Sequence, residues 1–270
     1  MKSLSTKMVE ESLAKPDIHR QWGDEYLIEE NERFFNLAFD YVVRELNAPR
    51  DATILDAGCG ICLHARRLAA RGFNVVAVDF SESILREAEE AVRAAGLSRK
   101  ITLRREDLLS LSFRDGSFDY IVCWGVLMHI PDVETALSEL ARVLRPGGLL
   151  VVSEGNMHSF QAKLRRDRCS IKGMQCLGVK RTPAGMEYWA SSPAGMILTR
   201  HADMEWLIEK GRSNLLYVRS HVAGQFTDLY TRTPSRLSRK LIHLFNNFWF
   251  AHIRFPRLAF GNIVLFEKEV

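Results

Sequence analysis

The sequence predicts an α/β fold built on a doubly wound parallel sheet, and three observations support this. Short apolar runs alternate with amphipathic helical patterns from residue 51 to residue 155, which is typical of strand–helix–strand units. A glycine turn joins the first apolar run to a helical pattern, and an acidic residue ends the second run. The 270 residues, 47% of them hydrophobic, provide enough apolar surface for a large core.

The first half of this pattern is delimited by helix start and stop signals. We expect strands at 52–58 and 73–80 and helices at 62–72 and 81–97, each helix followed by a glycine stop signal. Ser81 is placed to cap the second helix. Apolar side chains recur there at helical spacing, at Ile84, Leu85, Ala88, Val92 and Ala95.

The second half continues the alternation. Strands are expected at 100–107, 118–125 and 149–155. A helix at 131–148 begins at a proline and ends in Pro-Gly-Gly, which are ordinary helix start and stop signals.

The flanking regions are harder to interpret. Residues 30–46 predict an amphipathic helix, whereas 156–202 show little periodicity and are long for a connection, so we expect a functional loop there. The last part predicts two helices and two strands, at 203–211, 215–222, 235–250 and 262–269. We therefore divide the chain into an N-terminal helical lid segment (1–50), a ligand-binding core (51–155), an insertion expected to cap the substrate (156–202) and a C-terminal part that completes the same sheet (203–270).

Charge and composition exclude some classes of protein. The net charge of +4 is spread among nearly equal numbers of acids and bases, which argues against a nucleic-acid partner. The first residues lack the apolar run of an export signal, so we expect a cytoplasmic protein. The apolar stretch from Leu241 is too short to span a bilayer. We expect its large side chains to pack on the sheet, with a membrane-surface role as the lesser alternative: Leu241, Phe245, Phe248 and Trp249.

The five cysteines form no even framework, and we expect reduced thiols and no metal. Cys59-x-x-Cys62 could be half of a zinc or redox site, but no second pair completes it. Cys59 is otherwise simply a small residue in a tight turn.

The glycine turn predicts a nucleoside site. A turn that feeds a helix N-terminus lets backbone N–H groups approach a ligand, and Gly58 and Gly60 have no side chains to obstruct it. Asp79 ends the next strand 21 residues after Gly58, where a carboxylate can accept both ribose hydroxyls. Turn and cap chemistry alone is the structural alternative for these residues.

The turn also disfavours a dinucleotide. Leu63 stands where a dinucleotide fingerprint needs its third glycine, and Asp56 would repel a phosphate. A ligand with a ribose, an ammonium group and a positive centre fits better, and S-adenosylmethionine is the obvious candidate.

Five motifs in order resemble those of class I S-adenosylmethionine-dependent methyltransferases: LDAGCG (55–60), VDFS (78–81), EDL (106–108), FDYIVC (118–123) and LRPGG (144–148). The resemblance covers roughly residues 51 to 155 and is strongest to the small-molecule branch that includes quinone-biosynthesis enzymes. It implies a Rossmann-like, seven-stranded sheet in which the final strand, here NIVLFEK, is inserted antiparallel.

The same resemblance implies roles for individual residues. Asp56 and the backbone of the glycine turn would hold the methionine end of the cofactor, and Asp79 would bind its ribose. Asp107 and the Leu108 amide would contact the adenine edge, where a turn or cap is the alternative for Asp107. Phe80 and Ile84 would pack on the adenine ring or belong to the core. The predicted cofactor residues are Asp56, Ala57, Gly58, Cys59, Gly60, Asp79, Phe80, Ile84, Asp107, Leu108, Cys123 and Trp124.

Methyl transfer needs alignment first and a base only for some acceptors, so a general base is optional. His129 and Glu154 are the catalytic candidates, since both follow strands that end at the expected ligand edge. The alternative for His129 is a hydrogen bond to the loop backbone. Weaker candidates are His158 and His201.

The acceptor is expected to be a small molecule that receives the methyl group on oxygen or nitrogen. An aromatic lid over it is predicted from Trp22, Tyr26, Tyr188 and Trp189, although these residues could equally be core. The basic run 163–168 could bind an acidic substrate or form a solvated helix face. An RNA or protein methyltransferase and a non-catalytic S-adenosylmethionine-binding protein remain alternatives.

Overall fold

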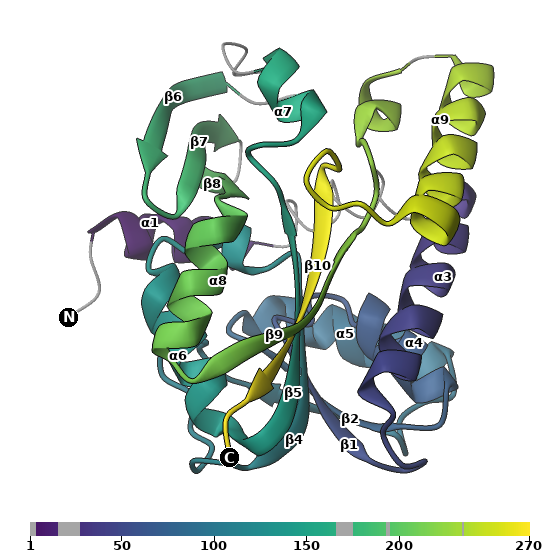
Figure 1. Ribbon diagram of the computed structural model, residues 1–270. Coiled ribbons are helices and arrows are strands. Elements are labelled where there is room, and N and C mark those ends of the chain that lie inside the picture. The colour runs from purple at the N-terminus through teal and green to yellow at the C-terminus, as the bar shows by residue number, and fades with distance from the viewer. Residues whose placement is uncertain (1–3, 16–27, 166–174, 193–194, 234) are drawn as a thin grey trace.

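A seven-stranded sheet forms the centre of the protein (Figure 1). The computed structural model describes residues 4–15, 28–165, 175–192, 195–233 and 235–270. The strand order is β3-β2-β1-β4-β5-β10-β9. The strands are β1 (Thr53–Ala57), β2 (Asn74–Asp79), β3 (Ile101–Arg105), β4 (Phe118–Trp124), β5 (Leu144–Gly155), β9 (Leu216–Ala223) and β10 (Gly261–Lys268).

All of these strands are parallel except β10, which pairs antiparallel with both β5 and β9. The predicted fold class and the antiparallel last strand are therefore confirmed. The strand order reverses beside β1, since β2 lies on one side of it and β4 on the other. Such a reversal leaves a crevice at the carboxyl ends of the strands, where open α/β sheets bind ligands.

Helices cover both faces of the sheet and form two apolar cores. One face packs against α6 (Val133–Val143) and α8 (Met204–Ser213). The other packs against α3 (Glu29–Leu46), α4 (Leu63–Ala70) and α5 (Glu82–Ala94). In Figure 1 the sheet therefore lies between two helical layers.

Side-chain caps explain where several helices begin. The Ser81 hydroxyl accepts the Ile84 N–H at 3.4 Å, which confirms the predicted cap of α5. Asp132 caps α6 and Asp203 caps α8 in the same way. The helix predicted at 131–148 is shorter, because β5 begins at Leu144 and includes the Pro-Gly-Gly segment.

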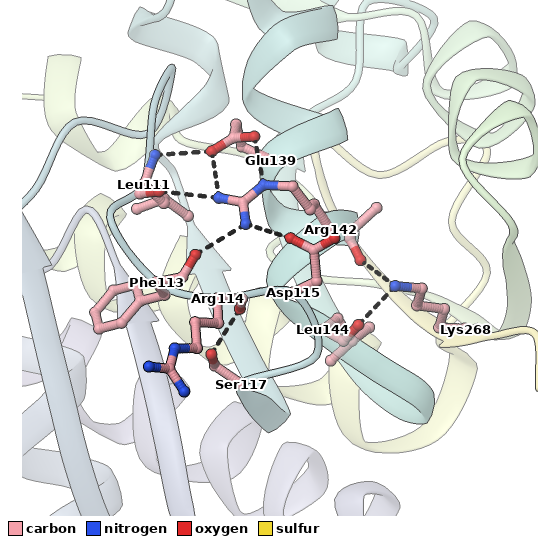
Figure 2. A network of polar contacts seen from close by, with 10 residues as sticks. Leu111, Phe113, Arg114, Asp115, Ser117, Glu139, Arg142, Leu144 and Lys268 are labelled. Carbon is pink, nitrogen blue, oxygen red and sulfur yellow. Dashed lines mark hydrogen bonds and ion pairs between the residues drawn. The ribbon is translucent and has the colours of Figure 1, made fainter.

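A polar network joins the amino end of the sheet to the loop before β4 (Figure 2). The Arg142 guanidinium donates to the carboxylates of Glu139 and Asp115 and to the carbonyls of Leu111 and Phe113. At the end of β10, Lys268 Nζ donates to two carbonyls, those of Ala141 and Leu144, each at 2.7 Å. These contacts tie the last strand to the α6–β5 junction.

The insertion 156–202 is not the structureless loop that its sequence predicts. It contains α7 (Phe160–Arg165) and a separate antiparallel sheet of β6 (Gln175–Thr182), β7 (Gly185–Ser192) and β8 (Gly195–Ala202). The expected lack of structure is therefore wrong. Both faces of β8 are partly buried, so its sequence lacks the strict alternation of apolar and polar residues that identifies a half-exposed strand.

The N-terminal helix and one cysteine also differ from expectation. α1 (Leu4–Leu13) was not predicted, and it packs against β8 through Val9 and Leu13. Cys176 is disulfide-bonded, so the expectation of reduced thiols is wrong for that residue. Cys59, Cys62 and Cys123 are free and buried.

The C-terminal region contains η2 (Leu229–Arg232), α9 (Arg236–Phe248) and η3 (Trp249–Ile253) between β9 and β10. Leu241 and Phe248 are exposed, so the prediction that they pack on the sheet is wrong. Phe245 and Trp249 contact Phe226 instead. Among the described residues, none of the helices combines the length and apolarity that crossing a bilayer requires.

Candidate functional site

The turn after β1 is held in the shape that its glycines allow. Gly58 and Gly60 both have positive φ angles, +78° and +52°. A Cβ on Gly58 would lie 2.5 Å from Val126 Cγ1, so only glycine fits beneath the loop after β4. A Cβ on Gly60 would meet no atom within 4 Å, which leaves the approach to this part of the turn open.

Asp79 ties the turn to the end of β2. One carboxylate oxygen accepts the Gly60 N–H at 3.1 Å and the other accepts the Ser81 N–H at 3.0 Å. The sequence-predicted constellation of Gly58, Gly60 and Asp79 is therefore assembled in space. Asp79 is also a structural residue of the turn, which the sequence alone left as an alternative.

Asp56 is the most unusual carboxyl group of this edge. It is 2% exposed, and burial raises its pKa to about 7, with the Ala65 amide opposing and the Asp79 charge adding to the shift. Its Oδ2 atom has no hydrogen-bond partner among the residues that the structure describes. A buried acceptor without a donor is costly, so this atom suits a ligand that brings a cationic donor to it.

The predicted adenine side is more enclosed. Ile84 is fully buried and Leu108 is 7% exposed, while Asp107 accepts the Leu109 N–H at 3.0 Å in a local turn. Phe80 is half-buried and packs with Val9 and Leu13 of α1.

The remaining predicted cofactor residues lie mostly under the site. The side chains of Ala57, Cys59 and Cys123 are buried in the two cores. Trp124, at the end of β4, is half-buried and lies 5.4 Å from the His64 ring and 5.1 Å from the Phe39 ring.

A second buried carboxyl group lies behind the loop that follows β4. Glu154 Oε1 accepts the Leu127 N–H at 2.9 Å, and burial raises the pKa of this carboxyl to about 8. Its Oε2 atom lacks a hydrogen-bond partner within the described part of the chain. The two catalytic candidates thus lie at the two ends of η1 (Leu127–His129), since Glu154 binds its first residue and His129 is its last.

The insertion holds this loop from the outside. His129 Nδ1 lies 2.7 Å from the Leu198 carbonyl oxygen of β8. Arg200, 2% exposed, donates to the carbonyls of Leu127, Ile130 and Pro131 and pairs with Glu187 at 2.8 Å. A small cavity between Glu154 and Arg200 is lined further by Leu127, Met128, Val133, Ala184, Ala202, Trp206 and Leu207.

The two described residues of the predicted aromatic lid point in different directions. Trp189 packs with Phe80 and α1, and its Nε1 donates to Glu187 at 3.1 Å. Tyr188 is buried against His201, with ring centroids 4.7 Å apart. Trp22 and Tyr26 lie outside the described residues.

α1 packs over the predicted adenine side of the site. The Ala14 carbonyl, just after the helix, accepts from Ser83 Oγ at 2.5 Å and from Ser81 Oγ at 3.3 Å. Both serines belong to the first turn of α5, directly after Asp79 and Phe80. Residues 4–15 and the insertion sheet therefore meet above the same edge.

Sequence reasoning missed three contributors to this edge: α1, Arg200 and His64. His64 stacks on Phe39 with ring centroids 4.8 Å apart, and burial lowers its pKa to about 3. The pattern around Arg200 gave no sign of burial, since an arginine in a strand usually faces water. The signal for His64 was its place in the first turn after the glycine motif.

Comparison with known proteins agrees with this geometry. Residues 55–152 match the model of a methyltransferase domain. The chain is 40% identical over 111 residues to a 2-methyl-6-phytyl-1,4-hydroquinone methyltransferase from Synechocystis, covering 40% of this chain and 33% of the relative. It is 38% identical over 116 residues to a demethylmenaquinone methyltransferase from Geobacillus kaustophilus, covering 42% of this chain and 49% of the relative.

Residues 55–152 form a class I methyltransferase domain. The cofactor of this domain is S-adenosylmethionine. The matches span half or less of the two curated relatives' length, so they describe the domain and not the whole chain.

A solved structure extends the likeness of fold beyond the domain. The structure of a SAM-dependent methyltransferase from Methanosarcina mazei aligns with a TM-score of 0.59 and 21% identity, covering 85% of this chain and 97% of that one. The methyltransferase domain and the strands that complete its sheet therefore share one known architecture.

The residues present in the domain fit this cofactor. Asp56 offers a buried oxygen without a protein donor, Gly60 is open to approach, and Asp79 holds a carboxylate at the adjacent strand end. These are the acceptors that an ammonium group and a ribose require.

Proposed function

We propose that this protein transfers a methyl group from S-adenosylmethionine to an oxygen or nitrogen atom of a small-molecule acceptor. The observation that carries the proposal is the buried Asp56 oxygen without a protein donor, beside an open glycine turn at the point where strand order reverses. Two of the relatives are named for a phytyl hydroquinone and for demethylmenaquinone, which supports a small, largely apolar acceptor for this chain.

The cofactor, when bound, supplies an electrophilic methyl group on a sulfonium centre. The chain's own contribution at this end is positioning. Asp56 accepts from the ammonium group, and the turn at Gly58 and Gly60 admits the methionine portion without side-chain obstruction. Asp79 accepts from the ribose hydroxyls, which a carboxylate already fixed by two N–H donors can do without reorganising.

On the adenine side, the proposed contacts are Asp107 and the Leu108 amide, with Phe80 and Ile84 as the apolar walls. Ile84 and Leu108 are buried, while Phe80 keeps part of its ring exposed. The half-buried Phe80 ring is therefore the wall on which the proposal chiefly depends.

The acceptor side rests on the loop after β4. Glu154 is protonated at neutral pH because burial raises its pKa to about 8, so it holds a proton that it can donate in a hydrogen bond. His129 is the better candidate for accepting a proton from an acidic acceptor group, because a neutral imidazole ring has one nitrogen that accepts. Its Nδ1 lies 2.7 Å from the Leu198 carbonyl oxygen, which can only accept a hydrogen bond, so Nδ1 carries the proton in this contact and the ring is held in place.

Exclusion of water is the proposed role of the insertion and of α1. Trp189, Phe80, Val9 and Leu13 form one apolar cluster above the adenine side. Such a cover strengthens the electrostatic contacts beneath it and keeps water from the sulfonium.

Calorimetry of the full chain with S-adenosylmethionine, its demethylated product and NAD tests the first half of this proposal. We expect binding of the first two and none of NAD, because Asp56 opposes a phosphate. Micromolar NAD binding without response to S-adenosylmethionine would refute the proposal.

A screen of phenols, hydroquinones and amines with the methyl-labelled cofactor tests the second half. Label transferred to an oxygen or nitrogen of a small molecule supports the proposal. Label found only on RNA or protein would replace the acceptor class while leaving the cofactor site intact. Cofactor binding with no acceptor among any of these classes would favour a non-catalytic binding protein.

A further inference from the structure

α9 is oriented the opposite way to an ordinary surface helix. The helix residues that are buried are polar: His243, Asn246 and Asn247. Asn246 accepts the Thr227 N–H at 3.1 Å and donates to the Thr227 carbonyl at 2.9 Å, and the His243 ring lies 4.2 Å from Tyr230. The polar face of the helix is therefore the one that holds it to the protein.

The outward face of α9 is apolar. Leu237, Leu241, Leu244 and Phe248 are 68%, 58%, 61% and 52% exposed. They recur at spacings of three and four residues, so they lie along one side of the helix. Further exposed apolar side chains follow directly after the helix, at Ile253, Phe255 and Leu258. We refer to these seven residues as the α9 apolar face.

All the Asp, Glu, Lys and Arg positions in the segment that bears this face are basic residues. Residues 229–266 contain no Asp or Glu and carry six basic residues: Arg232, Arg236, Arg239, Lys240, Arg254 and Arg257. Arg236, Lys240 and Arg257 are exposed. An outward apolar stripe in a segment whose charged side chains are all positive is typical of a helix that lies in the interface of an anionic membrane.

The α9 apolar face belongs to the same end of the molecule as the cofactor site. β9 ends at Ala223 beside Asn262, one residue along β10 from the Gly261–Gly155 pair that ends β5. The chain therefore leaves the sheet towards α9 at the edge where Gly58, Asp79 and Glu154 lie. In Figure 1, α9 and the β6–β8 sheet rise on opposite sides of the carboxyl end of β5.

We propose that the α9 apolar face docks the protein on the surface of an anionic lipid bilayer. The helix lies parallel to the membrane plane with its leucines and Phe248 among the acyl chains, while Arg236, Lys240 and Arg257 contact lipid phosphates. The proposal does not depend on methyl transfer, since vesicle binding is measured without cofactor or acceptor.

The charge of the segment favours a lipid bilayer over a second copy of the chain as the partner of the α9 apolar face. A symmetric contact through this face would place two purely basic segments against each other, and like charges at an interface oppose association. An anionic lipid surface supplies the complementary charge, and it accepts an exposed apolar helix face without a matching groove.

Sedimentation of the full chain with vesicles tests the proposal. The vesicles are phosphatidylcholine alone, or phosphatidylcholine and phosphatidylglycerol in roughly equal parts. We expect binding to the anionic vesicles, weakened by added salt because screening shortens the reach of surface charge. The triple variant Leu237→Ser, Leu241→Ser, Leu244→Ser should bind at least about a hundredfold more weakly, since each exposed leucine adds roughly a factor of ten when inserted.

Matched controls separate docking from general effects. Leu215→Ser removes a leucine that is 50% exposed at the opposite end of β9, and it should leave vesicle binding unchanged. Arg236→Glu with Lys240→Glu should weaken binding to the anionic vesicles about tenfold or more. Arg93→Glu with Arg99→Glu, exposed near the opposite edge, should change it much less.

Three outcomes would overturn the proposal. These are no sedimentation of the wild-type chain with anionic vesicles, equal loss in Leu215→Ser and the triple variant, or dimerisation that the triple variant abolishes while vesicles bind neither protein. Unchanged circular dichroism and melting of all variants verify that the exposed substitutions leave the fold intact.

Discussion

At the amino edge of the sheet, Arg142 and Lys268 direct their donors to neighbouring carboxylates and carbonyls, whereas at the carboxyl edge Asp56 and Glu154 each keep one buried oxygen without a partner among the described residues. The pKa values follow the same division. Arg142 hydrogen-bonds to Glu139 and lowers its pKa, while burial raises those of Asp56 and Glu154.

The two edges of the sheet therefore differ in whether their polar groups have hydrogen-bond partners. Satisfied polar groups stabilise the fold, and unsatisfied buried ones lower stability unless a ligand completes them. Perturbed carboxyl groups gathered in a crevice are typical of functional sites. The amino edge therefore secures the sheet, and the carboxyl edge is the one where we propose that the ligand binds.

Asp79→Ala should produce the largest effect at the carboxyl edge. Loss of two charge-assisted hydrogen bonds to ribose, about 1.5–3 kcal/mol each, should weaken S-adenosylmethionine binding at least about a hundredfold by calorimetry. Melting should also fall, because the Gly60 and Ser81 amides lose their acceptor. Asp115→Ala, at the exposed amino edge, should leave affinity unchanged. Lower melting of Asp79→Ala with full affinity would reduce Asp79 to a cap.

Glu154→Gln should abolish a loss of stability that the wild-type protein undergoes as the pH rises. Between about 4.5 and about 8, the folded protein keeps a proton on Glu154 that the unfolded chain has released, so stability falls as pH rises through this window. Gln keeps the acceptor for Leu127 without the charge. Chemical denaturation near pH 9 should therefore show the variant more stable by up to about 3–5 kcal/mol, with little difference near pH 4.

Glu139→Gln provides the matched control at the amino edge, with the opposite sign. The pKa of Glu139 is lowered by Arg142, so its contribution is present at neutral pH and is lost as pH falls through the lowered value. This variant should be less stable than wild type near pH 7, and the difference should shrink in acid. The same pH trend in both variants would contradict the division between the two edges.

Arg142→Met should lower stability without changing ligand binding. It removes donors from two carboxylates and two carbonyls, which should cost about 1–3 kcal/mol and several degrees of melting temperature. Arg86→Met, which breaks an exposed pair with Glu82 within α5, should change stability by less than about 0.5 kcal/mol. Weaker cofactor binding in Arg142→Met would show that the two edges are coupled.

The smallest expected effect concerns the pH dependence of affinity. Asp56 must be ionised to accept an ammonium group, and its pKa is about 7. Cofactor affinity should therefore rise with pH up to about neutrality, by at most about tenfold per unit below the pKa. Asp56→Asn should bind more weakly and lose this dependence in calorimetry at several pH values. A pH dependence that survives in Asp56→Asn would assign it to another group.

The sequence by itself determined the sheet core and the glycine–aspartate constellation. Gly58, Gly60 and Asp79 lie within one strand–helix–strand unit, and the handedness and pairing of such units bring the two strand ends together. Helix caps such as Ser81 were equally predictable, because they depend on residues three positions apart.

Only the tertiary structure decided the cover of the site and the orientation of α9. The Arg200 contacts cross 69 to 73 residues of sequence, so no local periodicity reports them. The pattern of α9 predicted a buried apolar side, since burial of apolar surface is the usual driving force. Instead, the Asn246 side chain hydrogen-bonds to the backbone N–H and carbonyl of Thr227, and the polar side of α9 is the buried one. Long-range contacts of this kind are set by the packing of whole elements, which is why a residue pattern alone leaves them open.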